Sequence, residues 1–394
     1  MDIQLPDSVL HAIGLLNVAG YDAYVVGGCV RDSLLGVEPD DWDIATSATP
    51  EEIRQVFTAY RIMDIGLQHG TLTVVVQDLV LEITTFRVDG DYSDGRHPDT
   101  VQYTTSLLED LHRRDFTVNA MAYHPFEGLI DLYHGQEDLA AGIIRCVGEP
   151  EKRLREDALR ILRALRFSTT LNFAIEPKTE AALIHLAPTL TRVSTERIAD
   201  EFCKLFLNRN AVRTIIKYKE VLAVVLPELK RVDDFSLLSI PSTSMYVRFS
   251  ALFWKSDVEV QEVQEALQRL RFDKRTVQVT TLLLSCREMP INSNYDLLRL
   301  LNRITPSLIW VYLSLREADE SVIQRAKNLL DENACYNIPI LEIDGEDVIA
   351  AGIPQGPEVG RTLYAVLDAV MDGKCPNRKE DLLRWIENMK RPVQ

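Results

Sequence analysis

The strongest constraint on the fold is a change of pattern near Glu149. Before it, short β-branched runs alternate with helical segments. Residues 71–76 and 79–86 are two such runs, separated by Gln77-Asp78, and they predict a β-hairpin. After it, apolar residues recur at helical spacing, with prolines between the runs. The sequence therefore predicts an α+β fold, in which a small mixed α/β head is followed by an all-α remainder.

Composition excludes several other classes of protein. With 46% hydrophobic residues the chain can build cores, and its 394 residues suffice for two to four domains of ~100–200 residues. No apolar run approaches the ~18 residues that span a bilayer, and the acidic N-terminus does not resemble a secretion signal. Six scattered cysteines indicate free thiols in a reducing compartment. We expect a cytoplasmic monomer that has no membrane segment.

The charge of the chain is unevenly distributed. A net charge of −16 argues against a general attraction to nucleic acid. However, residues 152–166 contain six basic residues against two acidic ones, and residues 374–391 contain six against three. Such stripes allow an acidic protein to bind a polyanion locally.

Two aspartates that follow a turn indicate a metal site. Asp41 and Asp43 stand two apart on an expected strand, so their side chains point to one side while Trp42 points to the other. Two such carboxylates repel each other unless a cation lies between them, and oxygen ligands favour Mg²⁺ when phosphates complete its shell. A solvated polar turn is the alternative. Glu82, inside the apolar run 79–86, is either a third carboxylate of this site or a residue on the solvated face of an edge strand.

The residues around Gly27-Gly28 predict a strand, a tight turn and a helix. Gly28 allows the backbone to approach a ligand, the helix N-terminus favours phosphate, and Arg31 adds a charged donor. A simple turn is the alternative reading. Because two aspartates follow some ten residues later, a phosphate cradle and a metal pair lie close together in the sequence. Transfer of a nucleotidyl group requires that combination.

A helix expected over residues 152–168 carries a candidate base-recognition pair. Its apolar residues form one stripe, and the opposite half carries Asp157, Arg160, Arg163 and Arg166. Asp157 can only accept hydrogen bonds and Arg160 can only donate them, so together they match the Watson–Crick edge of cytosine or adenine. Guanine and uracil carry a carbonyl in place of the amine and would leave Asp157 unpaired. A solvated charged face is the alternative.

These residues lie in segments that resemble a known family. Residues 27–32 (GGCVRD), followed by Asp41-Trp42-Asp43, resemble the signature of class II tRNA nucleotidyltransferases and bacterial poly(A) polymerases, of the DNA-polymerase-β-like superfamily. The resemblance covers roughly residues 20–210, and beyond them it is diffuse. Four further segments match the family's motifs in order: 113–122 (RRDFTVNAMA), 131–135 (DLYHG), 155–160 (REDALR) and 194–201 (STERIADE). In the last segment we interpret Arg197 and Glu201, at i,i+4, as a helix-stabilising ion pair.

The resemblance implies a domain order and an activity. It implies a nucleotidyltransferase head at 1–145, a helical neck for base recognition at 146–210, a helical body at 211–330 and a tRNA-binding helical tail at 331–394. The implied activity is Mg²⁺-dependent, template-independent addition of CCA to the 3′ end of tRNA from CTP and ATP, with release of pyrophosphate. The expected partners are the 3′ end and acceptor region of tRNA.

The resemblance also assigns roles to individual residues. Asp41 and Asp43 would bind the metal and, with Glu82, form the catalytic carboxylate set. The nucleotide-binding residues would be Gly28, Arg31, Arg114, Asp157, Arg160, Arg163 and Arg166. For Arg114 the alternative is a salt bridge within the head.

Three other functions stay open at the level of sequence. An enzyme that adds only A, or only CC, has the same motifs, although the loop at residues 89–98 resembles an element that CC-adding enzymes lack. A bacterial poly(A) polymerase has the same head but usually a strongly basic C-terminal extension. A non-catalytic helical RNA-binding protein is the alternative from another class, and the presence of both aspartates and Arg160 argues against it.

Overall fold

The computed structural model describes residues 3–67, 70–89 and 101–390. Its contacts divide the chain into two compact units, Met1–Lys230 and Arg231–Gln394, and each unit is described by itself. No helix in the described residues is long and apolar enough to cross a membrane.

A seven-stranded mixed sheet forms the centre of the N-terminal unit. Its strand order is β3-β4-β5-β2-β1-β8-β9, with β2 and β5 parallel and the other neighbours antiparallel. The predicted hairpin of residues 71–86 is confirmed as β4 and β5. The strands are β1 (Ala23–Val26), β2 (Trp42–Thr46), β3 (Arg61–Met63), β4 (Thr71–Val76), β5 (Leu79–Thr85), β8 (Met121–His124) and β9 (Gly128–Asp131). Short two-stranded pairs join β6 (Arg87–Asp89) to β7 (Val101–Tyr103) and β10 (Ile143–Ile144) to β11 (Ala174–Ile175).

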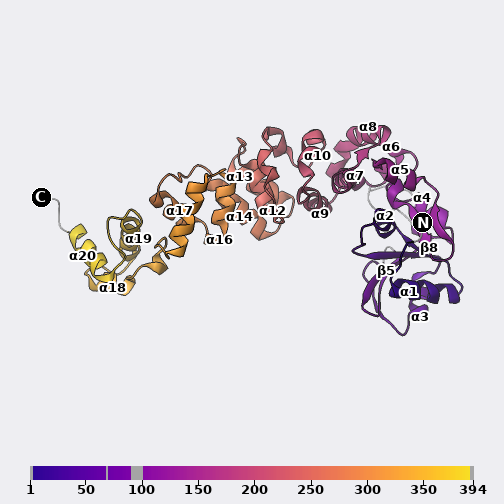
Figure 1. Cartoon of the computed structure of the whole chain (residues 1–394), viewed down its shortest axis with the longest axis horizontal. Coiled ribbons are helices and arrows are strands. Elements are labelled where there is room, and N and C mark those ends of the chain that lie inside the picture. Colours follow the sequence, from indigo (N-terminus) through magenta and orange to yellow (C-terminus); the bar gives the residue numbers. More distant parts are fainter. Residues whose placement is uncertain (1–2, 68–69, 90–100, 391–394) are drawn as a thin grey trace. The chain divides into compact units, whose positions relative to one another are not determined.

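Helices lie on both faces of the sheet. Figure 1 shows α1 (Asp7–Val18) and α3 (Pro50–Val56) on one face of the sheet and α2 (Gly28–Leu34) on the other. The helix α3 begins at a capping box, in which Thr49 and Glu52 each bind the other's backbone N–H. Two short helices, α4 (Leu107–His112) and α5 (Gly135–Ala141), complete the head.

Helices build the rest of this unit, and one of them differs from prediction. The single helix expected over 152–168 is wrong, because the structure divides it into α6 (Pro150–Glu156) and α7 (Leu159–Leu171). Asp157 lies between them in an extended conformation, with φ −144° and ψ 105°. Its carboxylate accepts a hydrogen bond from the backbone N–H of Leu159, and such local side-chain bonds compete with helix continuation. The other helices are α8 (Pro177–Leu186), α9 (Thr195–Phe206), α10 (Ala211–Lys217) and α11 (Lys219–Leu222).

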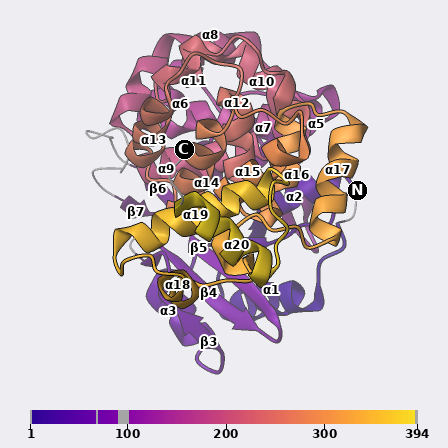
Figure 2. The ribbon, with the colours of Figure 1, turned by 90° about the vertical axis from the view of Figure 1, so that its left-hand side faces the viewer.

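The C-terminal unit consists of helices in its described residues. Several begin with the expected signals, such as a capping box at Ser293 and Asp296 or a proline in the first turn at Pro306 and Pro357. In Figure 2 the last three, which pack on one another, are drawn in yellow. The helices are α12 (Met245–Phe253), α13 (Val260–Arg269), α14 (Lys274–Ser285), α15 (Asn294–Arg303), α16 (Pro306–Leu315), α17 (Glu320–Asp331), α18 (Gly345–Ala350), α19 (Pro357–Met371) and α20 (Lys379–Lys390). The predicted fold class, a mixed α/β head followed by an all-α remainder, is confirmed. The four-part division at residues 145, 210 and 330 stays a prediction.

Candidate active site

Adjacent strands bring two of the predicted carboxylates together. Asp43 on β2 and Glu82 on β5 are direct partners in the parallel register, so their side chains project from the same face of the sheet. Asp41 lies just before β2 and is exposed, whereas Trp42 is buried, as the alternation predicted. Glu82 is exposed too, but β5 lies between β4 and β2 and is not an edge strand.

The carboxylate of Asp43 is destabilised by its surroundings. Its pKa is raised to about 6, mainly by burial and then by the negative charges of Asp41 and Glu82, while Arg114 opposes the shift. A cation at this place would relieve the repulsion, so the donor set fits a divalent metal. In the described part of the chain, no three acidic, histidine or cysteine side chains are grouped closely enough to hold a metal ion by themselves. A metal here would therefore take further ligands from water or phosphate.

The glycine turn places an arginine beside these carboxylates. Gly27 has φ +81°, a backbone conformation that residues with a side chain rarely adopt. A Cβ at this position would lie 3.0 Å from Nη1 of Arg114 and 3.8 Å from Oδ2 of Asp43. Gly28 begins α2, and a Cβ there would make only an ordinary contact with Arg31 at 3.6 Å. The constrained glycine is thus Gly27, whereas the sequence prediction named Gly28.

Two arginines of the head are held by other side chains at this turn. Nη2 of Arg114 donates to Oδ2 of Asp110 at 3.2 Å. This is a salt bridge within the head, the alternative that the sequence analysis gave for Arg114. The buried Nε of Arg114 has no hydrogen-bond partner. Arg31 donates to Asp32 at 2.8 Å and to Oδ1 of Asn119 at 2.6 Å. Both guanidinium groups are thereby fixed in orientation next to the carboxylates.

The residues of the predicted base-recognition pair have partners within the protein. Asp157 accepts hydrogen bonds from Arg197 at 2.6 and 3.2 Å. Arg160 is 8% exposed and donates to Glu156 at 2.7 Å and to the carbonyls of Arg153 and Arg113 at 2.8 and 3.0 Å. Because the helix is interrupted between them, these two residues do not share a continuous helix face.

The predicted ion pair between Arg197 and Glu201 is wrong. Arg197 binds Asp157, and Glu201 instead accepts from Arg166 at 2.6 Å and lies 3.7 Å from Arg163. The packing of α9 against α7 directs Glu201 towards the arginines of α7, which the spacing within one helix does not reveal.

Arg163 connects α7 to the head. It donates to Oδ2 of Asp115 through Nε at 2.8 Å. Asp115 is buried, yet Arg163 and Asn119 lower its pKa to about 2 despite the cost of burial. Asp115 therefore stays ionised and holds the side chain of Arg163 in place.

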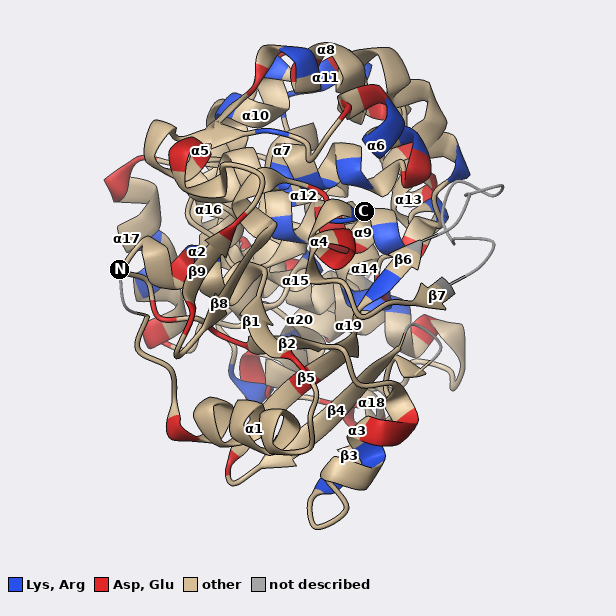
Figure 3. Cartoon of the chain, turned by 90° about the vertical axis from the view of Figure 1, so that its right-hand side faces the viewer, with Lys and Arg blue, Asp and Glu red and all other residues tan. Residues whose placement is uncertain are grey.

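Most of the predicted site residues line one cavity of about 520 Å³ within the N-terminal unit. Its lining contains seven arginines and four aspartates, and nine of the ten predicted site residues are among them. Glu82 is the exception and lies beside Asp43, outside the lining. Figure 3 shows blue lysine and arginine segments on α6 and α7. The sequence prediction missed these lining residues: Gly27, Arg113, Asp115, Asn119, Leu159, Phe167 and Arg197.

Most of the missed residues carried a signal in the sequence. Arg113, Asp115 and Asn119 belong to the segment RRDFTVNAMA, from which only Arg114 was assigned a role. The loop at residues 89–98, which resembles an element that CC-adding enzymes lack, lies outside the described residues apart from the backbone of Asp89 in β6.

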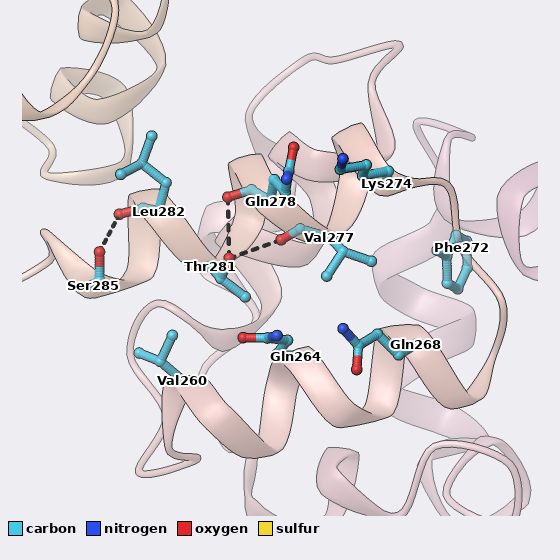
Figure 4. Close-up of a pocket in the computed structure, with 10 residues that line it drawn as sticks. All are labelled: Val260, Gln264, Gln268, Phe272, Lys274, Val277, Gln278, Thr281, Leu282 and Ser285. Carbon is cyan, nitrogen blue, oxygen red and sulfur yellow. Dashed lines mark hydrogen bonds between the residues drawn. The ribbon is translucent and has the colours of Figure 1, made fainter.

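A second cavity lies in the C-terminal unit between α13 and α14. It measures about 700 Å³, and Figure 4 shows ten lining residues from Val260 to Ser285. Its polar groups are the amides of Gln264, Gln268 and Gln278, two hydroxyls and Lys274, and the ten residues include no acid, histidine or cysteine. This cavity therefore has neither metal-binding carboxylates nor a general base, and the candidate active site is the arginine-rich cavity.

Family models and relatives match almost the whole chain. The poly(A) polymerase head domain matches residues 23–145, the probable RNA- and SrmB-binding site of polymerase A matches 172–232, and tRNA nucleotidyltransferase domain 2 matches 243–386. The CCA-adding enzyme of Leuconostoc mesenteroides is 35% identical over 393 residues and covers 97% of each chain. That of Geobacillus stearothermophilus is 36% identical over 401 residues and covers 96% of this chain and 95% of its own.

Solved structures of CCA-adding enzymes share the fold of this chain. The crystal structure of the Bacillus stearothermophilus CCA-adding enzyme in complex with CTP has a TM-score of 0.79 at 33% identity and covers 98% of both chains. The Thermotoga maritima CCA-adding enzyme complexed with tRNA has a TM-score of 0.67 at 21% identity, covers 98% of this chain and 97% of its own, and shares the fold.

Proposed function

The chain belongs to the family of CCA-adding tRNA nucleotidyltransferases, and from this premise we propose that it adds CCA to the 3′ end of tRNA, using CTP and ATP and releasing pyrophosphate. One observation carries the proposal: a single cavity collects the paired aspartates, the glycine turn and seven arginines, with the base-recognition pair on its lining. Nucleotidyl transfer needs a site for divalent metal, a site for the triphosphate and a means of base selection, and this cavity offers all three.

Asp41 and Asp43 are the proposed metal ligands, with Glu82 as the third carboxylate beside them. Bound Mg²⁺ would activate the RNA 3′ hydroxyl and stabilise the charge on the departing pyrophosphate. The arginines of the cavity provide planar, charge-assisted donors for phosphate oxygens. Arg114 is well placed for this role, since it lines the cavity close to the Gly27 turn and to Asp43.

We assign base selection to Asp157 and Arg160. Arg160 is held by Glu156 and two backbone carbonyls, so its orientation is fixed before a nucleotide binds. A carboxylate has about four acceptor sites, and Asp157 uses three in the bonds to Arg197 and Leu159. One acceptor site is thus left for an exocyclic amine, which cytosine and adenine offer.

The direct test uses three tRNA transcripts that end before CCA, after C and after CC. Each is incubated with Mg²⁺ and with CTP alone, ATP alone or both, and the added nucleotides are read on a sequencing gel. We expect two C residues and then one A on the first transcript, followed by termination. Addition of A alone, of CC alone or of a long A tract would assign one of the related activities, and no addition to any transcript would overturn the proposal.

A further inference from the structure

Three arginines of the cavity surround the aromatic ring of Phe167 on α7. The guanidinium carbon of Arg166 lies 3.9 Å from the ring centroid, and those of Arg31 and Arg163 lie 5.2 Å from it. All three distances are within the ~6 Å over which the negative face of an aromatic ring attracts a cation. Phe167 is 6% exposed and lines the cavity.

Each of these arginines also has a carboxylate partner. The donor–acceptor distances are 2.8 Å for Arg31 to Asp32, 2.7 Å for Arg163 to Asp115 and 2.6 Å for Arg166 to Glu201. The carboxylates fix one edge of each guanidinium group, and Glu201 links two of the groups, since it also lies 3.7 Å from Arg163. The contact that all three share is the ring.

The ring itself is held by a second aromatic side chain. Phe116 is fully buried and packs against Phe167 with ring centroids 5.8 Å apart and planes at 78°. Such an edge-to-face contact restricts rotation of the Phe167 ring. The ring is therefore a fixed surface between α2 in the head, which carries Arg31, and α7, which carries Arg163 and Arg166.

We propose that Phe167 is a positioning residue, whose ring holds Arg31, Arg163 and Arg166 at the spacing that binds the triphosphate of the incoming nucleotide. This inference rests on the proposed function, which places a nucleoside triphosphate in the cavity. In this role Phe167 acts through arginines that would bind phosphates, which CTP and ATP share, so it should act equally on both nucleotides and leave base discrimination unchanged. A leucine would fill a similar volume but has no negative face, and the mutual repulsion of the arginines would then be less well opposed.

The first test compares Phe167→Leu with wild type in steady-state kinetics. We expect the KM for CTP and for ATP to rise by the same factor, roughly tenfold, while kcat changes by less than about threefold. Phe202→Leu is the matched control, because Phe202 is also fully buried and stacks on Phe206 at 5.1 Å, yet it does not line the cavity. It should reduce stability and leave both KM values unchanged.

The second test keeps the shape of the side chain and changes only its electrostatics. Phenylalanine, monofluoro-, difluoro- and trifluorophenylalanine are incorporated at position 167, which weakens the negative face step by step. Binding of inorganic tripolyphosphate, which has no base, is measured by calorimetry. We expect the Kd to rise with each fluorine and to reach roughly five- to tenfold for the trifluoro variant.

These measurements separate the inference from the function on which it rests. If wild type incorporates nucleotides but the fluorinated series shows one constant Kd, Phe167 only fills space and the inference is wrong. A rise in the KM of only one nucleotide would overturn it as well. If the Kd for tripolyphosphate rises across the fluorinated series as expected but wild type adds no nucleotide to tRNA, the proposed function fails and the role of the ring stands. If Phe167→Leu does not fold, the fluorinated series still tests the inference about Phe167.

Discussion

At the scale of single residues, Asp43 links metal binding to stability. Its pKa of about 6 in the folded protein lies above the ordinary value of 3.8, so the folded state binds a proton more readily than the unfolded state does. The folded protein consequently loses stability as the pH rises through this range, and the penalty is fully present above pH 6. A neutral side chain at this position removes the penalty.

We therefore predict that Asp43→Asn abolishes nucleotide transfer and yet stabilises the metal-free protein. The free energy of unfolding should rise by about 1–2 kcal/mol at pH 8, and the gain should vanish near pH 4, where the aspartate itself is protonated. Urea unfolding in the presence of a chelator measures both values. Asp78→Asn is the control, because Asp78 is exposed and its charge is not among those that raise the pKa of Asp43. Equal gains at both pH values would contradict this account.

Asp157 provides a second prediction at this scale. Asp157→Ala removes the acceptor for the exocyclic amine, so discrimination against UTP and GTP should fall by about 1–3 kcal/mol, or roughly ten- to a hundred-fold in relative kcat/KM. Arg197 loses its partner in the same variant. Arg197→Gln is therefore the control, which breaks that ion pair but leaves the acceptor in place. If kcat/KM for all four nucleotides falls by one common factor, Asp157 does not select the base.

At the scale of elements, α9 orients the arginines of α7 through Glu201. This carboxylate is 4% exposed and accepts a hydrogen bond from Arg166, whose pKa is lowered by burial even with Glu201 beside it. Glu201→Gln removes the counter-charge of the largely buried Arg166, so the free energy of unfolding should fall by about 2–3 kcal/mol. Asp200→Asn, exposed on the same helix, should stay within about 0.5 kcal/mol of wild type in chemical denaturation. If Glu201→Gln lowers the free energy of unfolding by no more than Asp200→Asn does, α9 does not hold α7 through Glu201.

Prediction from sequence was correct where the residues concerned are neighbours in the chain, and it failed at the junction of α6 and α7. The hairpin of β4 and β5, the glycine turn before α2 and the alternation of Asp41, Trp42 and Asp43 were predicted correctly, because each depends on residues that are neighbours in the chain. Apolar periodicity could not reveal the break between α6 and α7, since the apolar stripe continues across it.

Partners far apart in the sequence were equally hidden. Arg163 meets Asp115 across 48 positions and Arg197 meets Asp157 across 40. Spacing within one helix favoured Arg197 with Glu201 instead, and only the packing of α9 on α7 corrects it. The resemblance to a family identified nine lining residues of the cavity, but it did not indicate which of them bind one another.

At the scale of the whole molecule, the nucleotide site and the C-terminal basic stretch belong to different units of the chain. Every residue that lines the arginine-rich cavity belongs to the unit of residues 1–230. The basic stretch of residues 374–391, by contrast, belongs to the other unit, and two of its lysines are paired there, Lys374 with Asp372 and Lys379 with Asp347. Phosphate contacts made by such residues would add salt-dependent affinity for RNA.

We predict that a fragment of residues 1–230 binds CTP nearly as well as the full chain but handles tRNA poorly. Its Kd for CTP, measured by calorimetry, should stay within about threefold of the full-length value, because all lining residues are retained. Its kcat/KM for tRNA should fall at least ~tenfold, and the dependence of that value on salt should weaken, because phosphate contacts made by the second unit are lost. Circular dichroism and cooperative thermal unfolding serve as the check that the fragment is folded. A folded fragment that uses tRNA as well as the full chain would show that residues 231–394 do not hold the substrate, whereas one that no longer binds CTP would show that the nucleotide site depends on both units.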